Sequence, residues 1–401
     1  MGSQGPLEGL RVIELGQLIA GPFAGRMLAD FGAEVIKVEP PGSGDDMRQW
    51  GMHRYQGHGL WWPLQSRNKK LITLDLRQQA GRVLLLRLVE SADVLIENFR
   101  PGTLERWNLG PAQLQQSNPR LVIARVSGYG QTGPYADRPG FASVGEAMGG
   151  LRYINGYPGQ APPRPGVSLG DSLAALFAVQ GILMALYHRD VRGGTGQVVD
   201  ASIMESCFAM LDSTVPEYGK VGAIREPSGS RIGSAAPSNI YTAADGKYIV
   251  IGANADNLFR RLCAAMGRPE LADDPRFASH WQRFQNVDEL DRIIQDWVGG
   301  REAAEVDRVL NAAGVVAGPV YSIADIFEDR HYQARGMLVR MQDELLGEMV
   351  MPGVVPKLSE TPGELREPGS WTLGRHNQEI FGDLLGLSAE DMAGLTKEKV
   401  I

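Results

Sequence analysis

The first half of the chain alternates short apolar runs with longer segments of helical period. The apolar runs have the length and composition of buried strands and lie at residues 10–15, 33–39, 71–76, 93–99 and 120–128. Between them, residues 22–32 and 78–92 carry apolar side chains at helical spacing, and Pro22 suits the first turn of a helix. Strands that alternate with helices predict an α/β fold whose mainly parallel sheet is covered on both faces.

The pattern changes after about residue 222. Residues 225–239 are rich in Gly, Ser and Pro without any period, which is typical of a linker or a mobile loop. Residues 240–253 predict a hairpin that turns at Asp245-Gly246, and helical patterns dominate from 257 to 313. Residues 373–395 are helical again. We therefore expect a second, smaller domain in the middle of the chain.

Residues 163–189 contain a single acidic side chain, Asp171, directly before a long apolar run. The run from 173 to 187 is apolar apart from Gln180; it is too short to span a bilayer and predicts a buried helix. Asp is favoured at helix N-caps, and its negative charge suits the positive end of the helix dipole. These residues alone leave two roles open for Asp171, and they favour a helix cap over a nucleophile because caps are far commoner.

Composition limits the class of protein. A chain of 401 residues that is 43% hydrophobic can form a large core. The net charge of −7 argues against a nucleic acid or a membrane as the main partner. The two cysteines, Cys207 and Cys263, are too few for a disulfide framework. The N-terminus lacks the basic and apolar segments of a signal peptide, so we expect a cytoplasmic enzyme.

The common cofactor motifs are absent from the sequence. The first strand–helix turn, ELGQLIAGPFAG, matches neither G-x-G-x-x-G nor the P-loop pattern. There is no G-x-S-x-G or H-E-x-x-H, and the histidines (53, 58, 188, 280, 331 and 376) lack metal-ligand spacing. We therefore expect no metal site and no tightly bound cofactor.

Several phrases remain distinctive. They are IAGPFAGRMLADFGAEVIKVEPPGSGD (19–45), SRNKKLITLDL (66–76), ENFRPGTLERWNLG (97–110), SGYGQTGP (127–134), PGVSLGDS (165–172) and GGTGQVVDASIMES (193–206). Singly each could be a glycine-containing turn, but together and in this order they closely resemble the family III CoA-transferases, which include formyl-CoA and carnitine CoA-transferases. The resemblance covers nearly the whole chain.

The resemblance implies a particular architecture. A Rossmann-like large domain is built from both chain ends, which we place at residues 1–222 and 321–401. A smaller central α+β domain with its flanking linkers then occupies 223–320, in agreement with the change in composition. Family resemblance also implies an interlocked homodimer and coenzyme A as a substrate rather than a bound cofactor.

The resemblance makes Asp171 the nucleophile. An ionised carboxylate can attack a thioester to give an aspartyl anhydride, which the CoA thiolate converts to an aspartyl-CoA thioester. One thioester is exchanged for another, so no ATP is needed, in agreement with the absent P-loop. The N-terminus of the helix should keep Asp171 ionised, so that capping and attack are compatible.

CoA contacts follow from the same phrases, position by position. The residues that match the family's CoA-binding positions are Leu18, Ile19, Lys70, Asn98, Phe99, Arg100, Arg106, Ser127, Gly128, Tyr129 and Gly130. One contact is missing, because Pro40 stands where formyl-CoA transferases have an arginine.

The main alternative within the same fold is an acyl-CoA racemase or epimerase. Such enzymes have a His-Asp pair after the GYGQxGP phrase, where this chain has Phe141 and Ala142, and phenylalanine cannot transfer a proton. A catalytically silent CoA-binding protein is a second alternative, and Asp171 in its expected phrase argues against it.

The loop at 228–237 bears on the choice of acceptor. It lacks the glycine run of formyl-CoA transferases, and its Arg231 could clamp the distal carboxylate of a small dicarboxylic acid. Relatives of this kind often use succinyl-CoA as the donor. We therefore expect CoA transfer from an acyl-CoA such as succinyl-CoA to a small dicarboxylate.

Overall fold

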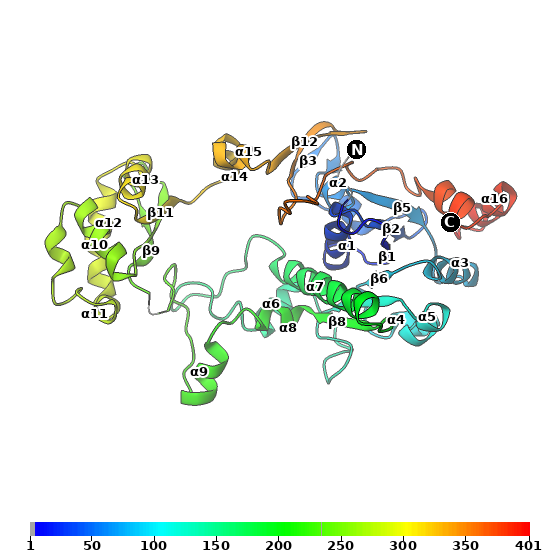
Figure 1. Ribbon diagram of the computed structural model, residues 1–401, viewed down its shortest axis with the longest axis horizontal. Coiled ribbons are helices and arrows are strands. Elements are labelled where there is room, and N and C mark those ends of the chain that lie inside the picture. Colours follow the sequence, from blue (N-terminus) through cyan, green and yellow to red (C-terminus); the bar gives the residue numbers. More distant parts are fainter. Residues whose placement is uncertain (1–4, 234) are drawn as a thin grey trace. The chain divides into compact units, whose positions relative to one another are not determined.

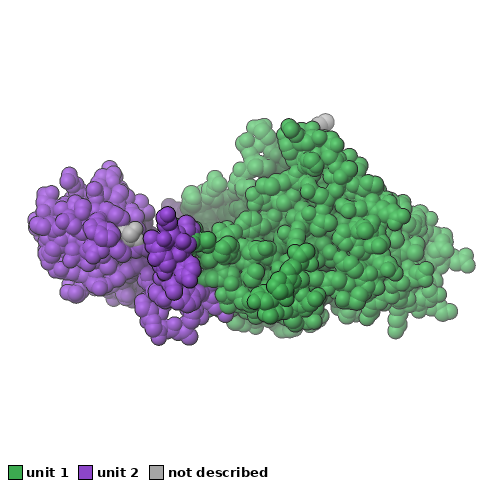
Figure 2. Space-filling model, turned by 90° about the horizontal axis from the view of Figure 1, so that it is seen from below, with its two compact units in different colours: residues 1–151, 164–215, 331–401 green, residues 152–163, 216–330 purple. Residues whose placement is uncertain are grey.

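The chain forms two compact units in the computed structural model, which describes residues 5–233 and 235–401 (Figure 1). Unit 1 consists of the residues up to 151 together with 164–215 and 331–401, so it contains both chain ends. Unit 2 consists of 152–163 and 216–330 (Figure 2). The second unit thus begins a few residues before the predicted boundary at 223, ends ten residues after 320, and includes a short segment from the first half of the chain.

A six-stranded parallel sheet forms the centre of unit 1. Its strands are β1 (Arg11–Glu14), β2 (Glu34–Glu39), β5 (Lys69–Thr73), β6 (Val94–Glu97), β7 (Val122–Ser127) and β8 (Val198–Ser202). They lie in the order β5-β2-β1-β6-β7-β8, and Val12 of β1 pairs with both Val35 and Val94. The predicted parallel α/β fold is confirmed. Strand β8 was not predicted, because its exposed Asp200 breaks the apolar pattern.

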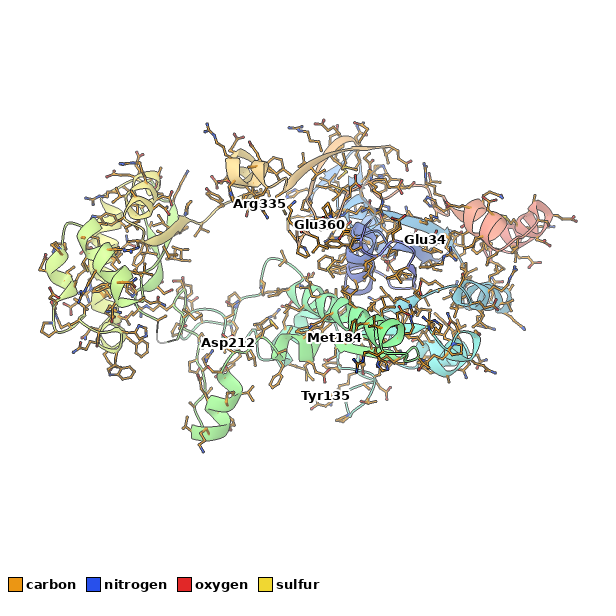
Figure 3. The ribbon with its side chains drawn as sticks, in the orientation of Figure 1. Glu34, Tyr135, Met184, Asp212, Arg335 and Glu360 are labelled. Carbon is orange, nitrogen blue, oxygen red and sulfur yellow. The ribbon has the colours of Figure 1, made fainter. Side chains whose placement is uncertain are left out.

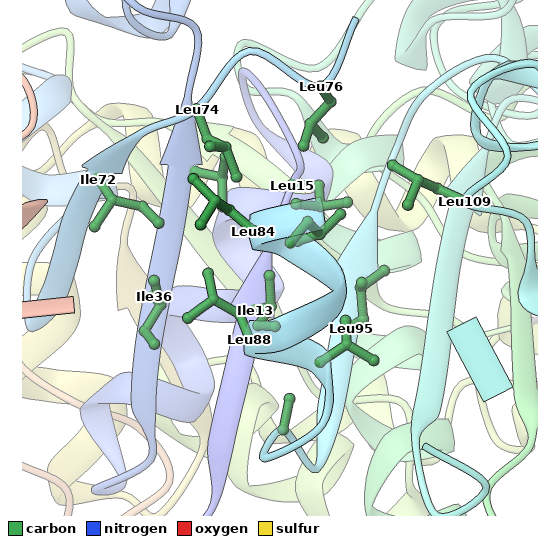
Figure 4. Packing of buried hydrophobic residues seen from close by; sticks show 14 of the residues in the cluster. Ile13, Leu15, Ile36, Ile72, Leu74, Leu76, Leu84, Leu88, Leu95 and Leu109 are labelled. Carbon is green, nitrogen blue, oxygen red and sulfur yellow. The ribbon is translucent and has the colours of Figure 1, made fainter. Parts of the chain in front are cut away.

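Strands β1, β2, β6 and β7 bury both of their faces, and successive side chains on each strand point in opposite directions. Val12, Val35 and Val94 belong to the core beneath α1 (Ala20–Asp30) and α7 (Leu169–Val191). Ile13, Ile36 and Leu95 belong to the opposite core, which Leu84 and Leu88 of α3 (Gln79–Val89) cover in Figure 4. The predicted coverage of the sheet on both faces is therefore confirmed.

Shorter elements complete unit 1. They are η1 (Asp46–Gln49), β3 (Arg54–Tyr55), β4 (His58–Gly59), α2 (Trp62–Gln65), α4 (Thr103–Arg106), α5 (Pro111–Ser117), α6 (Ala142–Met148), α8 (Ile203–Phe208), β12 (Leu338–Asp343), β13 (Gly347–Pro352), the π-helix η3 (Gln378–Leu384) and α16 (Ala389–Lys397). The helical prediction for 373–395 is confirmed for most of that segment by η3 and α16. The β12–β13 hairpin was not predicted.

Unit 2 has an antiparallel sheet in the order β11-β10-β9 and its own core, which contains Phe259, Leu290 and Val306. Its elements are β9 (Ser238–Thr242), β10 (Tyr248–Gly252), α10 (Asp256–Ala265), η2 (Pro269–Ala272), α11 (His280–Gln285), α12 (Val287–Gly299), α13 (Ala303–Ala312), β11 (Val316–Pro319) and α14 (Ile323–Glu328). The helices α9 (Thr214–Val221) and α15 (Arg330–Ala334) span the boundaries between the units. Strands β9 and β10 form the predicted hairpin around Gly246, whose φ of 76° favours glycine.

Helix α7 corrects the expectation for the apolar run at 173–187. It has 23 residues with a mean hydropathy of 1.7 over its most apolar window, so by length and composition it could cross a membrane. One face packs on the sheet through Ala175, Ile182 and Ala185, in the manner of a core helix. The other face is exposed, with Met184 at 60% and Tyr187 at 58%. The helix is therefore longer than predicted and buried on one face only.

Candidate active site

A cavity of about 230 Å³ opens at the carboxyl ends of β1, β6 and β7. The strand order reverses between β1 and β6, and such a switch point is where open α/β sheets bind ligands. Its lining residues are Gln17, Leu18, Ile19, Ala20, Trp50, Asn98, Phe99, Arg100, Pro101, Val126, Ser127, Gly128, Ala136, Arg138, Gly140, Phe141, Asp171 and Ile203. The fold thus forms a Rossmann-like crevice that lacks the glycine fingerprint for a dinucleotide.

Reciprocal hydrogen bonds join the two loops at the switch point. The Gln17 N–H donates to Asn98 Oδ1 at 2.8 Å, and Asn98 Nδ2 donates to the Gln17 carbonyl at 2.9 Å. Leu18 adopts a φ of 63°, which is strained for a branched side chain, and its N–H donates to Asp45 Oδ1 at 3.0 Å. Asn98 and Asp45 therefore hold the cavity-lining turn in a conformation that it would not adopt alone.

A buried ionic network supports this turn from beneath. Lys37 Nζ lies 2.8 Å from Asp45 Oδ2 and 3.1 Å from Glu14 Oε1, and the second oxygen of Glu14 lies 2.7 Å from Lys69 Nζ. Burial opposes the charge of Lys37, but Asp45 and Glu14 outweigh it and raise the pKa of the ammonium. Likewise Lys37 holds the pKa of Asp45 below its usual value despite burial. Every charge in this network has a partner, which is typical of structural ion pairs.

Asp171 is the third residue of α7 rather than its N-cap, which corrects the capping interpretation. The N-cap is Ser168, and its side chain makes no capping hydrogen bond. A carboxylate from another helix caps the end instead: Glu146 Oε1 on α6 accepts the N–H of Gly170 at 3.1 Å. In residues 5–233 and 235–401 no group donates a hydrogen bond to the Asp171 carboxylate or pairs with it as an ion. Asp171 therefore reaches the cavity with both oxygens available.

The electrostatics of Asp171 also differ from expectation. Burial, with a further contribution from the negative charge of Glu146, raises its pKa to about 6, although Arg164 opposes the rise. The helix N-terminus was expected to favour ionisation, but desolvation and the neighbouring carboxylate act in the opposite direction. At neutral pH the group is still mostly ionised, and it is a more basic carboxylate than an exposed aspartate.

The cavity brings together most of the residues predicted to contact CoA. Those that line it are Leu18, Ile19, Asn98, Phe99, Arg100, Ser127 and Gly128. Tyr129 is instead buried, and its hydroxyl lies 3.5 Å from the sulfur of Met148. Gly130 lies in a turn and has a φ of 93°. Arg106 donates to Thr103 Oγ1, and Lys70 pairs with Glu34 and Glu379 at 2.5 and 2.6 Å. The lining residues of the cavity include none of these four.

A second cavity, of about 320 Å³, shares Gln17 and Phe99 with the first. Its lining residues are Leu15, Gln17, Val38, Pro40, Pro41, Ser43, Asp75, Leu76, Arg77, Phe99 and Trp107. Phe99 and Trp107 stack edge to face with 5.5 Å between ring centroids. The two cavities are therefore neighbours that have Gln17 and Phe99 in common. The sequence analysis did not single out Arg77 or Trp107.

The sequence analysis also missed Gln17, Trp50, Arg138 and Glu146. Arg138 lies over the ring of Tyr135 at 3.8 Å, and Figure 3 labels Tyr135 in its loop. The motif ADRPGFAS that follows the GYGQTGP phrase could have pointed to Arg138, whereas Glu146 lies in a helical segment with no recognisable motif. Phe141 lines the cavity at the position where a racemase would need histidine.

Arg231 lies in unit 2, where two aspartates bind its guanidinium. Its Nη1 lies 2.8 Å from Asp288 Oδ1, and its Nη2 lies 2.7 Å from Asp291 Oδ2. The loop arginine is therefore already paired within its own unit. The described part of the chain has no cluster of three or more His, Cys, Asp or Glu that could hold a metal ion.

Comparison with known proteins identifies the family. A model described as "CoA-transferase family III" matches residues 7–377. The chain belongs to CoA-transferase family III. It is 53% identical to a succinyl-CoA–D-citramalate CoA-transferase of Chloroflexus aurantiacus, over 99% of this chain and 98% of the relative. It is 44% identical to the alpha subunit of a succinyl-CoA–L-malate CoA-transferase of the same species, over 99% and 92%.

A solved structure agrees with this assignment. The crystal structure of a CAIB/BAIF family protein from Brucella suis matches with a TM-score of 0.83 at 33% identity, and the match covers 95% of this chain and all of that one. The protein is therefore a CoA-transferase, coenzyme A is its substrate, and the predicted family is confirmed.

Proposed function

We propose that this CoA-transferase moves CoA from succinyl-CoA to a small hydroxy-dicarboxylic acid, with Asp171 as the nucleophile. The observation that carries the proposal is the Asp171 carboxylate, which lines the cavity without a hydrogen bond or ion pair from the described residues. The relatives from Chloroflexus aurantiacus, named for D-citramalate and L-malate, support the choice of donor and acceptor. Both of those acids are four-carbon dicarboxylic acid chains with a hydroxyl group.

The reaction proceeds through two kinds of covalent intermediate. An oxygen of Asp171 attacks the thioester carbonyl of succinyl-CoA, the C–S bond breaks, and a mixed anhydride and CoA thiolate result. The thiolate attacks the aspartyl carbonyl of the anhydride, which releases succinate and leaves Asp171 as a CoA thioester. The acceptor carboxylate attacks the aspartyl carbonyl of this thioester and releases the CoA thiolate, which leaves a second mixed anhydride. The thiolate then attacks the acceptor's carbonyl in this anhydride and forms the CoA ester of the acceptor. Asp171 is regenerated as a carboxylate.

CoA extends across both cavities in this proposal. Its thioester lies beside Asp171, and its pantetheine chain passes the turn at Leu18 and Ile19. The nucleotide occupies the second cavity, where Trp107 and Phe99 offer apolar and aromatic surface. Arg77 also lines this cavity, but its guanidinium already pairs with Asp75 at 2.8 Å, so a phosphate would have to compete with that carboxylate. Lys70, Arg106, Tyr129 and Gly130 stay predictions as CoA contacts.

Arg138 is the cation that we assign to the distal carboxylate of the acceptor. It lines the same cavity as Asp171 and pairs with no carboxylate in the described part of the chain. Arg231, the candidate from the sequence, already neutralises Asp288 and Asp291. A guanidinium without a partner offers a dicarboxylate more binding energy than one that must first break two ion pairs.

A transfer screen tests the proposed function. Purified protein is incubated with succinyl-CoA and one acid at a time: L-malate, D-citramalate, glutarate, or the monocarboxylates propionate and lactate. We expect CoA esters of the dicarboxylates to form fastest. In a parallel incubation in D₂O, an acyl-CoA with a stereogenic α-carbon should gain no deuterium. Equal rates with monocarboxylates would overturn the acceptor class, and α-deuterium incorporation without transfer would favour the racemase.

We also infer that a second copy of the chain covers the exposed face of α7. Met184, labelled on α7 in Figure 3, lines a surface groove of about 410 Å³ with Phe177 of the same helix and Val199 of β8. The groove also contains polar residues such as Gln180 and Glu205, but large exposed apolar side chains such as Met184 on one helix face are typical of a protein–protein contact. The family resemblance supports an interlocked homodimer. Its apparent mass should stay that of a dimer on dilution to nanomolar concentration, whereas a folded monomer at equilibrium would contradict it.

A further inference from the structure

The N-terminal end of α7 is capped from outside the helix. The first turn of a helix leaves backbone N–H groups without partners, and an acidic residue within that turn commonly binds them. Here Glu146 Oε1 accepts the Gly170 N–H at 3.1 Å, and only 1% of Glu146 is exposed. Asp171, the residue next to Gly170, accepts none of these groups.

Close packing of three helices holds Glu146 at this position. A Cβ atom at Gly145 of α6 would come within 2.6 Å of Ile203 Cγ2, and one at Gly170 of α7 would come within 2.9 Å of the same atom. A Cβ at Gly170 would also lie 3.2 Å from Glu146 Cγ. The two glycines therefore allow α6 and α7 to approach α8 closely enough for the Glu146 carboxylate to reach the helix end.

We propose that Glu146 is a positioning residue for CoA transfer: it occupies the N-terminal N–H of α7 and leaves the Asp171 carboxylate free to attack the thioester. This inference rests on the proposed function of Asp171 as the nucleophile. Two acidic residues thus act at the same helix end: Glu146 accepts the backbone N–H of Gly170, and Asp171 attacks the thioester.

The charge of Glu146 has a second consequence for Asp171. Burial and Glu146 raise the pKa of Asp171 to about 6, and Arg164, in the segment before α7, opposes them. On α8, burial together with Glu146 and Asp171 raises the pKa of the Cys207 thiol to about 11, so Cys207 adds no charge at neutral pH. The cations Arg100 and Arg138 line the same cavity as Asp171. A more basic carboxylate is a stronger nucleophile while it stays ionised.

The substitution Glu146→Gln separates these effects, because the amide oxygen still accepts the Gly170 N–H while the charge is lost. We expect the acid limb of the profile of kcat/KM against pH to move down by roughly 0.5 to 1 unit. At about pH 8 kcat should fall several-fold, and KM for succinyl-CoA should not change. Glu146→Asp keeps the charge but is one methylene too short for the N–H, so it should lower kcat without the same downward shift. Glu90→Gln, at the exposed C-terminal end of α3, makes the same change in net charge and serves as the control.

Covalent trapping distinguishes failure of this inference from failure of the proposed function. Wild-type protein with succinyl-CoA and hydroxylamine should give a hydroxamate at Asp171, detected by mass on its peptide. Trapping at another carboxylate would overturn Asp171 as the nucleophile, and with it both proposals. Trapping at Asp171 with the same pH profile in Glu146→Gln and the wild type would overturn only the role of Glu146. If Glu146→Gln does not fold, unchanged kcat in Glu146→Asp would also overturn that role.

Discussion

Two groups of carboxylates in unit 1 have opposite surroundings. Beneath the β1 turn, Asp45 and Glu14 lie within 3.1 Å of Lys37 Nζ, and the pKa of Asp45 is lowered. At the end of α7, Glu146 and Asp171 face each other's charge, and the pKa of Asp171 is raised to about 6. Each carboxylate of the first group pairs with Lys37, whereas Asp171 has no hydrogen-bond or ion-pair partner among the residues that the structure describes.

This difference in surroundings is the one expected between a structural acid and the nucleophile that we propose. A carboxylate whose oxygens both take part in ion pairs or hydrogen bonds cannot attack a thioester without first breaking one of these interactions. A half-buried carboxylate without a partner destabilises the fold, and such groups persist where function requires them. In this protein the paired network shapes the Leu18 turn, and the unpaired Asp171 lines the cavity beside it.

The largest expected effect comes from Asp171→Asn. The amide keeps the shape of the side chain but cannot form the aspartyl anhydride, so CoA transfer should fall by at least about three orders of magnitude. Transfer from succinyl-CoA to L-malate, followed by chromatography of the CoA esters, measures the loss. Asp190→Asn, at the other end of α7, is the control and should keep near-normal activity. Near-normal transfer by Asp171→Asn would make Asp171 a structural residue.

Replacement of Lys37, the cation at the centre of the buried ionic network, should destabilise the protein. Lys37→Met leaves the charges of Asp45 and Glu14 buried without their shared partner, which should cost about 3–5 kcal/mol in the free energy of unfolding. Urea denaturation measures this loss. Lys70→Met is a matched control, because Lys70 is half-buried and its pairs with Glu34 and Glu379 should contribute less than about 1 kcal/mol. If both substitutions cost the same, the network is not a special support of the turn.

Asp171→Asn should make the protein more stable near pH 7.5. An acid whose folded pKa is raised to about 6 binds more protons in the folded than in the unfolded state between about pH 4 and 6. Its contribution to stability therefore falls as the pH rises through this window. The variant avoids that penalty and should gain about 3 kcal/mol near pH 7.5, and almost nothing near pH 4. Urea melts at the two pH values test this, and a loss of stability at both would contradict the raised pKa.

The smallest effect concerns the acceptor. Arg138→Ala should raise KM for L-malate about tenfold, equivalent to about 1.4 kcal/mol, and leave KM for a monocarboxylate acceptor nearly unchanged. Arg231→Ala should change neither constant strongly, because Asp288 and Asp291 already bind its guanidinium. A larger rise of KM for L-malate in Arg231→Ala would assign the acceptor to the loop arginine instead.

Local patterns allowed much of the fold to be predicted. Most strands of the parallel sheet carry continuous apolar runs because both of their faces are buried. Strand β8 was not predicted from the sequence because its exposed Asp200 interrupts the apolar run. The β9–β10 hairpin was found because its turn needs a glycine at positive φ. The exposed face of α7 could not be foreseen, because an apolar helix has the same sequence whether a sheet or a second copy of the chain covers it.

The sequence by itself determined the family, the alternation of strands and helices, and Asp171 as the candidate nucleophile, because all three reside in contiguous phrases. Only the tertiary structure decided which acid caps α7 and what surrounds Asp171. Glu146 is 24 residues from Gly170 along the chain and reaches it only because α6, α7 and α8 pack closely. Likewise the sequence alone does not distinguish Arg138 from Arg231 as a binding residue. In the structure Arg138 lines the cavity, whereas two aspartates bind Arg231. Charge and reactivity depend on neighbours in space, and those neighbours come from distant parts of the chain.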